Sequence, residues 1–191
     1  MNNSEKINRI YIFSGSGAGS TTLGANIAKS RKIVHFDSDM YLWEAEIPPF
    51  GNLRDPIERN SLLSNDLRSD SSWVLSGSIC GWGDFSISFF DVVIFLYVPQ
   101  KERIRRYISR YTRNFGNKIL SPEHPLHKRF ASFKDWASSY DECTYDGQKH
   151  CKSVHERWIE KLSCPVILIE GIYTKEETLN LALEEVNILD S

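Results

Sequence analysis

The sequence has no long apolar run and no excess of basic residues. Its longest strongly apolar run, residues 92–98, falls far short of the roughly 20 residues that cross a bilayer. Residues 1–8 are polar and lack the apolar core of a signal peptide, so we expect a cytoplasmic protein with no membrane partner. Lys and Arg number 23 against 25 Asp and Glu, and this balance argues against a nucleic-acid partner.

Closely paired cysteines are missing as well. The four cysteines include no CxxC pair, and reduced thiols are the default in the expected compartment. Cys143, His150, Cys151 and His155 crowd together, but their spacing matches no common zinc module. We therefore expect free thiols and no structural metal in this region.

The composition is that of an ordinary globular protein. The chain has 191 residues, of which 41% are hydrophobic, enough for one compact domain without a stabilising disulfide or metal. Strand-like and helix-like segments alternate along it, which predicts a three-layer α/β fold with a parallel sheet. The predicted strands are residues 9–13, 32–36, 73–75, 91–98 and 165–170. The predicted helices are residues 21–31, 55–68, 100–113, 130–162 (mostly helical) and 175–186, with a loop at 114–128.

A glycine-rich segment, residues 14–22, joins the first predicted strand to the first predicted helix; we call it the glycine loop. Glycines let backbone N–H groups converge on an anion, and the N-terminus of the helix adds its dipole. The loop matches the phosphate-binding pattern GxxxxGK[ST] with two departures, Ser14 for the first glycine and Ser20 for the lysine. The predicted phosphate ligands are Gly15, Ser16, Gly17, Ala18, Gly19, Ser20, Thr21 and Thr22, with Thr21 also a ligand of Mg²⁺.

The missing lysine leaves two interpretations open. Ser20 can donate one hydrogen bond but carries no charge, so either a charge from elsewhere compensates or the site binds nucleotide with weak or no catalysis. Two other hypotheses are a simple glycine-rich turn and the dinucleotide pattern GxGxxG. The latter fits at Gly15 and Gly17, and Asp37 could imitate its acidic ribose ligand, but its third glycine falls on Ser20. The Ser-Thr-Thr run favours a Mg·nucleotide site.

Polar residues also follow the second and third predicted strands, where ligands bind in parallel sheets. Asp37 and Asp39 could hold Mg²⁺ and accept a proton from an acceptor hydroxyl, although an aspartate at such a place can equally cap a helix. Residues 77–84 carry three glycines, which permit close approach of a ligand. Here Trp82 could stack on a ring and Asp84 could accept hydrogen bonds, or the segment could be an irregular turn. The predicted substrate ligands in these segments are Asp37, Gly77, Ser78, Trp82 and Asp84.

Three further residues lie between the second strand and the next predicted helix or just inside that helix. These residues are Trp43, Arg54 and Arg59. Arg54 precedes the helix start at Asp55-Pro56 and could clamp an anionic acceptor, or it could be an ordinary surface arginine. We predict Trp43 and Arg54 as substrate ligands.

The helix predicted at residues 100–113 is strongly basic. Ile104, Ile108 and Tyr111 mark its expected buried stripe, and its arginines recur at helical spacing along another face. Such a face is usually solvated, but here it leads toward a loop that could close over phosphates. The hypothesis is that these arginines supply the charge that Ser20 cannot. The face comprises Arg103, Arg106, Arg110 and Arg113. Binding of single-stranded RNA by this helix is the alternative, which the balanced charge disfavours.

These segments together resemble the small P-loop kinases of the adenylate kinase and shikimate kinase group. Asp37-Ser38-Asp39 is similar to the DxD of shikimate kinases, and Arg106 and Arg110 match arginines at the lid entry of adenylate kinases. Residues 166–173 are similar to the last strand and base-contacting loop of adenylate kinases, which implies that Gly171 and Tyr173 border the adenine. Residues 77–84 are similar to the GSxxGWGD of bacterial kinase-like proteins with Ser or Thr in place of the lysine.

The resemblance implies a five-stranded sheet of order 2-3-1-4-5, a lid at about residues 111–130, and ATP and Mg²⁺ as cofactors. We predict an ATP-dependent phosphotransferase acting on a nucleoside, a nucleotide or a small hydroxy-compound, as a monomer or homodimer. Asp39, Arg110 and Arg113 are the predicted catalytic residues, Arg106 a nucleotide ligand, and Thr21 and Asp37 the metal ligands. The alternative is a nucleotide-binding protein with little or no kinase activity, either a sensor or a degenerate kinase.

Overall fold

A five-stranded parallel sheet forms the centre of the molecule. The computed structural model describes residues 6–44, 52–143 and 150–191. The strands are β1 (Arg9–Ser14), β2 (Val34–Asp37), β3 (Trp73–Ser76), β4 (Val92–Tyr97) and β5 (Val166–Glu170). Their order is β2-β3-β1-β4-β5, with every neighbouring pair parallel, so the predicted fold class and strand order are confirmed.

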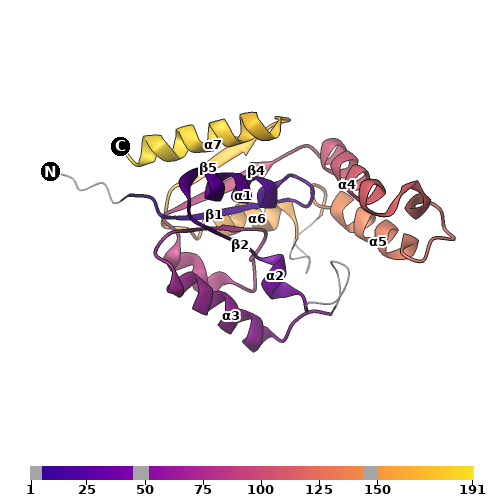
Figure 1. The fold of residues 1–191 in the computed structure, drawn as a ribbon, viewed down its shortest axis with the longest axis horizontal. Helices are drawn as coiled ribbons and strands as arrows, with labels where there is room; N and C mark the ends of the chain where they lie inside the picture. The colour runs from indigo at the N-terminus through magenta and orange to yellow at the C-terminus, as the bar shows by residue number, and fades with distance from the viewer. Residues whose placement is uncertain (1–5, 45–51, 144–149) are drawn as a thin grey trace.

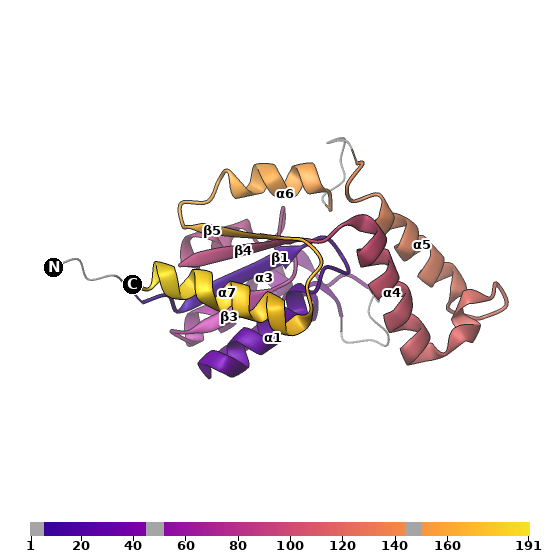
Figure 2. The same ribbon diagram turned by 90° about the horizontal axis from the view of Figure 1, so that it is seen from above.

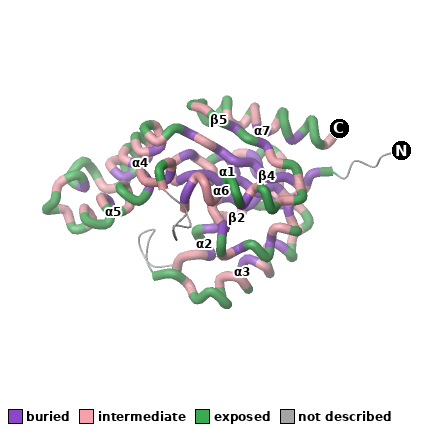
Figure 3. Tube along the Cα trace, turned by 180° about the vertical axis from the view of Figure 1, so that it is seen from behind, coloured by how far each residue is buried: buried purple, intermediate pink, exposed green. Residues whose placement is uncertain are grey.

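The strand β1 contributes to both hydrophobic layers because successive side chains point to opposite faces. Ile10 and Ile12 pack in one buried cluster, while Tyr11 and Phe13 pack in the other. All four side chains are fully buried, and Figure 3 shows the same burial along the neighbouring strands. The unbroken apolar sequence of β1 and β4 therefore reflects a sheet covered on both sides.

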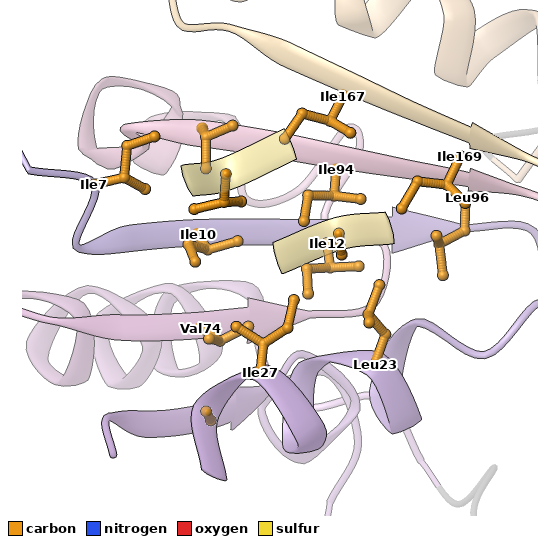
Figure 4. Close-up of a cluster of buried hydrophobic side chains, with 14 of the residues drawn as sticks. Ile7, Ile10, Ile12, Leu23, Ile27, Val74, Ile94, Leu96, Ile167 and Ile169 are labelled. Atoms are coloured by element: carbon orange, nitrogen blue, oxygen red, sulfur yellow. The ribbon is translucent and has the colours of Figure 1, made fainter. Parts of the chain in front are cut away.

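Helices cover the two faces. On the Ile10 face lie α1 (Ser20–Arg31) and α7 (Lys175–Leu189), and Figure 4 shows Leu23 and Ile27 of α1 against the isoleucines of the sheet. On the opposite face lie α3 (Pro56–Ser69), the 3₁₀ turn η1 (Asp84–Phe89) and α6 (Lys152–Ile159), which bury Leu63, Leu67 and Trp158 among others. The short helix α2 (Asp39–Leu42) follows β2.

An arm of helices projects beyond the carboxyl edge of the sheet. It consists of α4 (Gln100–Phe115), the 3₁₀ turn η2 (Asn117–Leu120) and α5 (His127–Ser138), and Figures 1 and 2 both place it to one side of the strands. A separate cluster of Tyr107, Tyr111, Ile119 and Phe130 holds the arm together. The segment predicted as a lid, residues 111–130, lies within this arm.

Two sequence predictions in this region are confirmed only in part. Residues 130–162 contain two helices, α5 and α6, and the chain leaves helix α5 after Ser138. On α4 the fully buried side chains are Arg103 and Tyr107, with Tyr111 nearly so, while Ile104 and Ile108 are only partly buried. Helical spacing shows which side chains of α4 share a face, but it does not show which face is buried. Here the buried face includes Arg103, because this arginine has an ion-pair partner.

The prediction of four free thiols is also wrong. Cys143 and Cys151 form a disulfide with their Cα atoms 5.8 Å apart, within the range that a disulfide requires. Cys80 and Cys164 remain free. Across the described ranges, no group of three or more His, Cys, Asp or Glu side chains could hold a metal ion, and no helix is long and apolar enough to cross a membrane.

Candidate active site at the carboxyl edge of the sheet

A cavity of about 1260 Å³ opens where the carboxyl ends of the strands meet the arm. The register places Asp37 of β2 beside Ser76 of β3, and Ser76 beside Ile12 of β1, so the loops that follow these strands share one edge. Every residue of the glycine loop, 14–22, lines the cavity. The other predicted site residues in its wall are Asp39, Trp43, Gly77, Ser78, Trp82, Arg106, Arg110, Arg113 and Tyr173.

The glycine loop has the backbone geometry of an anion cradle. Gly17 and Gly19 have φ values of 88° and 111°, in the region that favours glycine. A Cβ atom on Gly17 would lie 2.6 Å from the carbonyl oxygen of Arg103, whereas one on Gly19 would meet nothing within 4 Å. Gly19 precedes α1 without a side-chain cap, so the first N–H groups of the helix are available to a ligand. This cradle fits the phosphates of a nucleotide.

Two arginines of α4 hold the carbonyl groups of the glycine loop. Arg106 donates from Nη1 to Ala18 O at 3.0 Å and from Nη2 to Tyr173 O at 3.2 Å. It also pairs with Glu102, whose pKa the hydrogen bonds from Arg105 and Arg106 lower to about 2. Arg106 therefore links the glycine loop to the loop after β5.

Arg103 does not belong to the cavity-facing row in which the sequence analysis placed it. Its side chain is fully buried and pairs with Asp141 at 2.7 Å. It donates to Val98 O at 2.9 Å, to Ala137 O at 3.2 Å and to Ser16 O at 3.4 Å. Arg103 thus ties α4, α5 and the glycine loop together from the inside.

Arg110 and Arg113 do face the cavity. The guanidinium of Arg110 lies 5.9 and 5.6 Å from the ring centroids of Tyr107 and Tyr111, and its charge acts on the carboxylate of Asp39. Among the described residues, no ion pair engages Arg110 or Arg113. Their charge is available to a ligand in the cavity.

Asp39 is the predicted catalytic carboxylate, and it lines the cavity. Its backbone N–H donates to Oδ1 of Asp37 at 3.1 Å, and the side chain of Trp43 hydrogen-bonds its carboxylate. The pKa of Asp39 is raised to about 6, first because surrounding protein displaces water and second because Asp37 carries a like charge; Trp43 and Arg110 oppose the rise. A carboxylate with such a pKa suits a proton acceptor near neutral pH.

The predicted metal ligands supply oxygen atoms of the kind that Mg²⁺ prefers. Thr21 lies in the first turn of α1 and lines the cavity, whereas Asp37 lies just behind the wall and holds the start of α2 through its bond to the Asp39 N–H. The hydroxyl of Thr21 and the carboxylates of Asp37 and Asp39 fit such an ion by their chemistry, and the metal assignment stays a prediction.

The segment after β3 forms the wall opposite the arm. Gly77 has a φ of 94° and lies against the side chain of Ser38, so the chain leaves β3 where a larger residue would not fit. The indole N–H of Trp82 donates to Ser78 O at 3.0 Å. Asp84 was predicted as a substrate ligand, but Oδ1 accepts from Gly81 N and from the indole of Trp158, and Asp84 lies outside the cavity lining.

Arg54, like Asp37 and Asp84, is a predicted substrate ligand that lies outside the cavity lining. It pairs with Glu58 at 2.8 Å and donates to the carbonyl groups of Tyr41 and Trp43. Arg59, in the first turn of α3, lines the cavity instead, with its guanidinium 5.0 Å from the ring centroid of Trp82. No hydrogen-bond partner among the described residues reaches its buried Nε.

The loop after β5 closes the remaining side. Tyr173 lines the cavity, and Gly171, with a φ of 139°, lies just outside the lining, where a Cβ atom would meet the ring of Tyr173 at 2.9 Å. Gly171 therefore shapes the loop that presents Tyr173.

His150, which was not among the predicted site residues, also lines the cavity. His150 accepts a hydrogen bond from the backbone N–H of Ser16 at 3.3 Å. His155 lies behind the wall, between Ser78 Oγ at 3.1 Å and Tyr140 Oη at 2.8 Å. The sequence analysis considered these histidines only as metal ligands, and nothing in the local spacing points to a loop more than 130 residues away.

Comparison with solved structures places the chain among proteins with the P-loop kinase fold. A gluconokinase from Sinorhizobium meliloti 1021 matches with a TM-score of 0.53 and 12% identity over 96% of this chain and 93% of that one. A shikimate kinase from Aquifex aeolicus matches with a TM-score of 0.51 and 17% identity over 94% and 96% of the two chains. These matches show that the chain shares the fold of these two kinases.

In sequence, the chain is 37% identical over 175 residues to the uncharacterized protein YqaC of Bacillus subtilis (strain 168), which covers 92% of this chain and 95% of that protein. The chain belongs to the same family as YqaC. No protein-family model matches it.

Proposed function

We propose that the protein is an ATP-dependent phosphotransferase that acts on a small anionic hydroxy-compound. One observation carries the proposal: a single cavity joins the glycine loop, the carboxylate of Asp39 and the guanidinium groups of Arg110 and Arg113. Phosphoryl transfer needs a phosphate cradle, a proton acceptor for the nucleophile and positive charge around the transferred group.

In this proposal each part of the cavity has one task. The glycine loop binds the phosphates, and Tyr173 borders the base. Thr21 and Asp37 would hold Mg²⁺, which would neutralise charge on the phosphates. The acceptor hydroxyl oxygen attacks the γ-phosphorus, the bond to the bridging oxygen of ADP breaks, and the hydroxyl proton passes to Asp39. Arg110 and Arg113 stabilise the charge on the transferred group.

The wall beside Asp39 favours an acceptor that carries a carboxylate or a phosphate. Arg59 lines this wall with its guanidinium near the ring of Trp82, and its buried Nε has no hydrogen-bond partner among the described residues. Arginine recognises planar and tetrahedral anions through several donors at once. A nucleotide or a hydroxy acid therefore suits this wall better than a neutral nucleoside.

A second candidate function is nucleotide binding with little or no phosphotransfer. Two observations favour it. Ser20 offers no charge to the terminal phosphate, and His150 already occupies the N–H of Ser16. In that case the protein would act as a sensor or a degenerate kinase.

A thermal-shift panel tests nucleotide binding first, with Mg·ATP, Mg·GTP, ADP and NAD as ligands. A ligand at about 100 times its dissociation constant adds about 2.7 kcal/mol, which for a chain of this size is a rise of about 5–11 °C in Tm. Stabilisation by Mg·ATP or ADP but not by NAD supports the proposal. No shift with any nucleotide contradicts both candidate functions.

Measurement of ADP production then separates the two candidates. Acceptors carrying a carboxylate or phosphate, shikimate and gluconate among them, are compared with neutral polyols and nucleosides. We expect acceptor-dependent ADP production that Asp39→Asn lowers about 100-fold or more. The matched control is Asp84→Asn, an aspartate of the same wall that faces away from the cavity. Nucleotide binding without any acceptor-dependent turnover supports the second candidate.

A further inference from the structure

The Ser16 N–H lies inside the glycine loop, yet its hydrogen-bond acceptor comes from a distant segment. Nε2 of His150 accepts this bond at 3.3 Å, and both residues line the cavity. The carbonyl group of Ser16 is held on its other side by Arg103. Because Nε2 is the acceptor, the neutral imidazole carries its proton on Nδ1.

Aromatic rings around its imidazole and the disulfide at the next residue fix the position of His150. Its imidazole stacks on Trp136, with ring centroids 4.1 Å apart and planes 19° apart. It also contacts the rings of Tyr140 at 5.0 Å and His155 at 5.6 Å. The next residue, Cys151, is joined to Cys143 by the disulfide and precedes α6. The imidazole is therefore held at the glycine loop by its surroundings rather than by one weak hydrogen bond.

We propose that His150 is a phosphate ligand that takes up a proton when nucleotide binds and so replaces part of the charge missing at Ser20. In the bound state a phosphate oxygen takes the Ser16 N–H as its donor. Nε2 of His150 gains a proton from solvent, and the resulting imidazolium donates that N–H to the same phosphate group. The inference rests on the proposed function in one respect, that the glycine loop binds a nucleotide.

Burial, and to a lesser extent the neighbouring charges, keep His150 neutral when no anion is bound. Burial and, secondarily, the positive charge of Arg103 lower its pKa to about 4. His155 is neutral as well, since burial lowers its pKa to about 3, and burial raises the pKa of the Tyr140 hydroxyl so that it stays protonated. Asp141 is paired with Arg103 and offsets its charge. No group in this set prevents protonation once an anion arrives.

The charge of a phosphate is large enough to reverse the protonation. One negative charge about 4 Å from the imidazole, at an effective dielectric constant of about 20, favours the charged form roughly a thousandfold. Starting from a pKa of about 4, this brings His150 to half protonation near pH 7. The affinity gained from the proton is then about tenfold at pH 6, about twofold at pH 7 and negligible at pH 8.

The test is calorimetric titration of the protein with the Mg²⁺ complex of the non-hydrolysable ATP analogue AMPPNP. Titrations in buffers of low and high ionisation enthalpy measure the protons taken up on binding. The wild type is expected to take up about half a proton at pH 7 and nearly one at pH 6. His150→Gln keeps a neutral acceptor for Ser16 but cannot gain charge, so its uptake falls close to zero and its affinity at pH 6 drops about tenfold.

Two further variants make the result decisive. His150→Phe keeps a ring on Trp136 and should behave like His150→Gln, which covers the case in which the glutamine disturbs the stacking. His124→Gln changes a histidine outside the cavity and should retain the uptake of the wild type. Equal uptake by wild type and both His150 variants overturns the inference, as does tighter binding by them at pH 6. Failure of the wild type to bind any nucleotide overturns the proposed function itself.

Discussion

Replacement of Arg103 by alanine should destabilise the protein far more than replacement of any exposed arginine of the same helix. The guanidinium is fully buried, and it supplies donors to Asp141 and to three backbone carbonyl groups. Removing one member of a buried ion pair typically costs 3–5 kcal/mol, because the other charge is left without compensation. The side chain of Asp141 is 18% exposed and stays partly hydrated, so we expect a loss of stability at the lower end of this range, about 3 kcal/mol.

Arg105→Ala is the matched control. Arg105 lies two residues further along α4, its side chain is 68% exposed, and it pairs with Glu102 at the surface. An exposed pair of this kind contributes about 0–1 kcal/mol. In a chain of this size each kcal/mol moves Tm by about 2–4 °C, so Arg103→Ala should lower Tm by about 6–12 °C and Arg105→Ala by at most a few degrees.

Urea denaturation and calorimetry measure both variants under one set of conditions. Arg103→Lys is a useful third variant, because an ammonium group can restore the charge opposite Asp141 but not the several directed donors of a guanidinium. It should fall between wild type and alanine. If Arg103→Ala and Arg105→Ala differ by less than about 1 kcal/mol, the assignment of Arg103 as the internal tie of the arm is refuted.

Three other perturbations have expected outcomes. Asp39 has a folded-state pKa of about 6, above its ordinary value near 4. Between pH 4 and pH 6 the native state therefore binds more protons than the unfolded state, and its stability falls as the pH rises. Asp39→Asn should raise the free energy of unfolding above pH 6 and leave it unchanged below pH 4, which denaturation at pH 4 and pH 7 would measure. Reduction of the Cys143–Cys151 disulfide, which spans 8 positions, should lower the free energy of unfolding by about 2–3 kcal/mol and lower Tm. A thiol titration that finds four free cysteines without reductant would contradict the disulfide. Thr174→Ala removes the capping box of α7 and should lower the free energy of unfolding by about 1 kcal/mol, as thermal denaturation would measure. An unchanged Tm would mean that this end of α7 is already frayed.

The sheet and the glycine loop could be predicted because their signals are local. Alternating apolar strands and helices define a parallel α/β fold, and the glycine spacing defines the register of the anion cradle at Gly17 and Gly19. The strand order came from the resemblance to kinases, since periodicity alone does not specify which strands are neighbours. The disulfide was mispredicted because the expected compartment argued against it, and because the approach of Cys143 to Cys151 depends on the tertiary path of the chain.

Arg54 and Asp84 were predicted as substrate ligands, but both lie outside the cavity lining. Arg54 and Arg59 are both arginines near the start of α3, and composition cannot choose between them. An isolated antiparallel bridge between Trp43 and Leu53 brings Arg54 against the carbonyl groups of the segment after β2, which uses its donors. Asp84 likewise turns inward because Trp158, 74 positions away, offers an indole N–H. Both outcomes depend on contacts between segments that are distant in the sequence.

In the proposed function the arm supplies the positive charge that Ser20 of the glycine loop lacks, so activity would depend on how the arm packs. Arg106 already uses its donors on Ala18 O, Tyr173 O and Glu102. Among the arginines of α4, those without an ion pair to a described residue are Arg110 and Arg113, further along the helix. A lysine in the loop would move with the phosphate cradle, whereas arginines on α4 reach the cavity only while that helix keeps its place. Arg103 holds this place from within, through the carbonyl group of Ser16 on one side and Asp141 on the other. A loss at Arg103 should therefore weaken both the fold and the electrostatic support of the cavity, although Arg103 itself lies outside its lining.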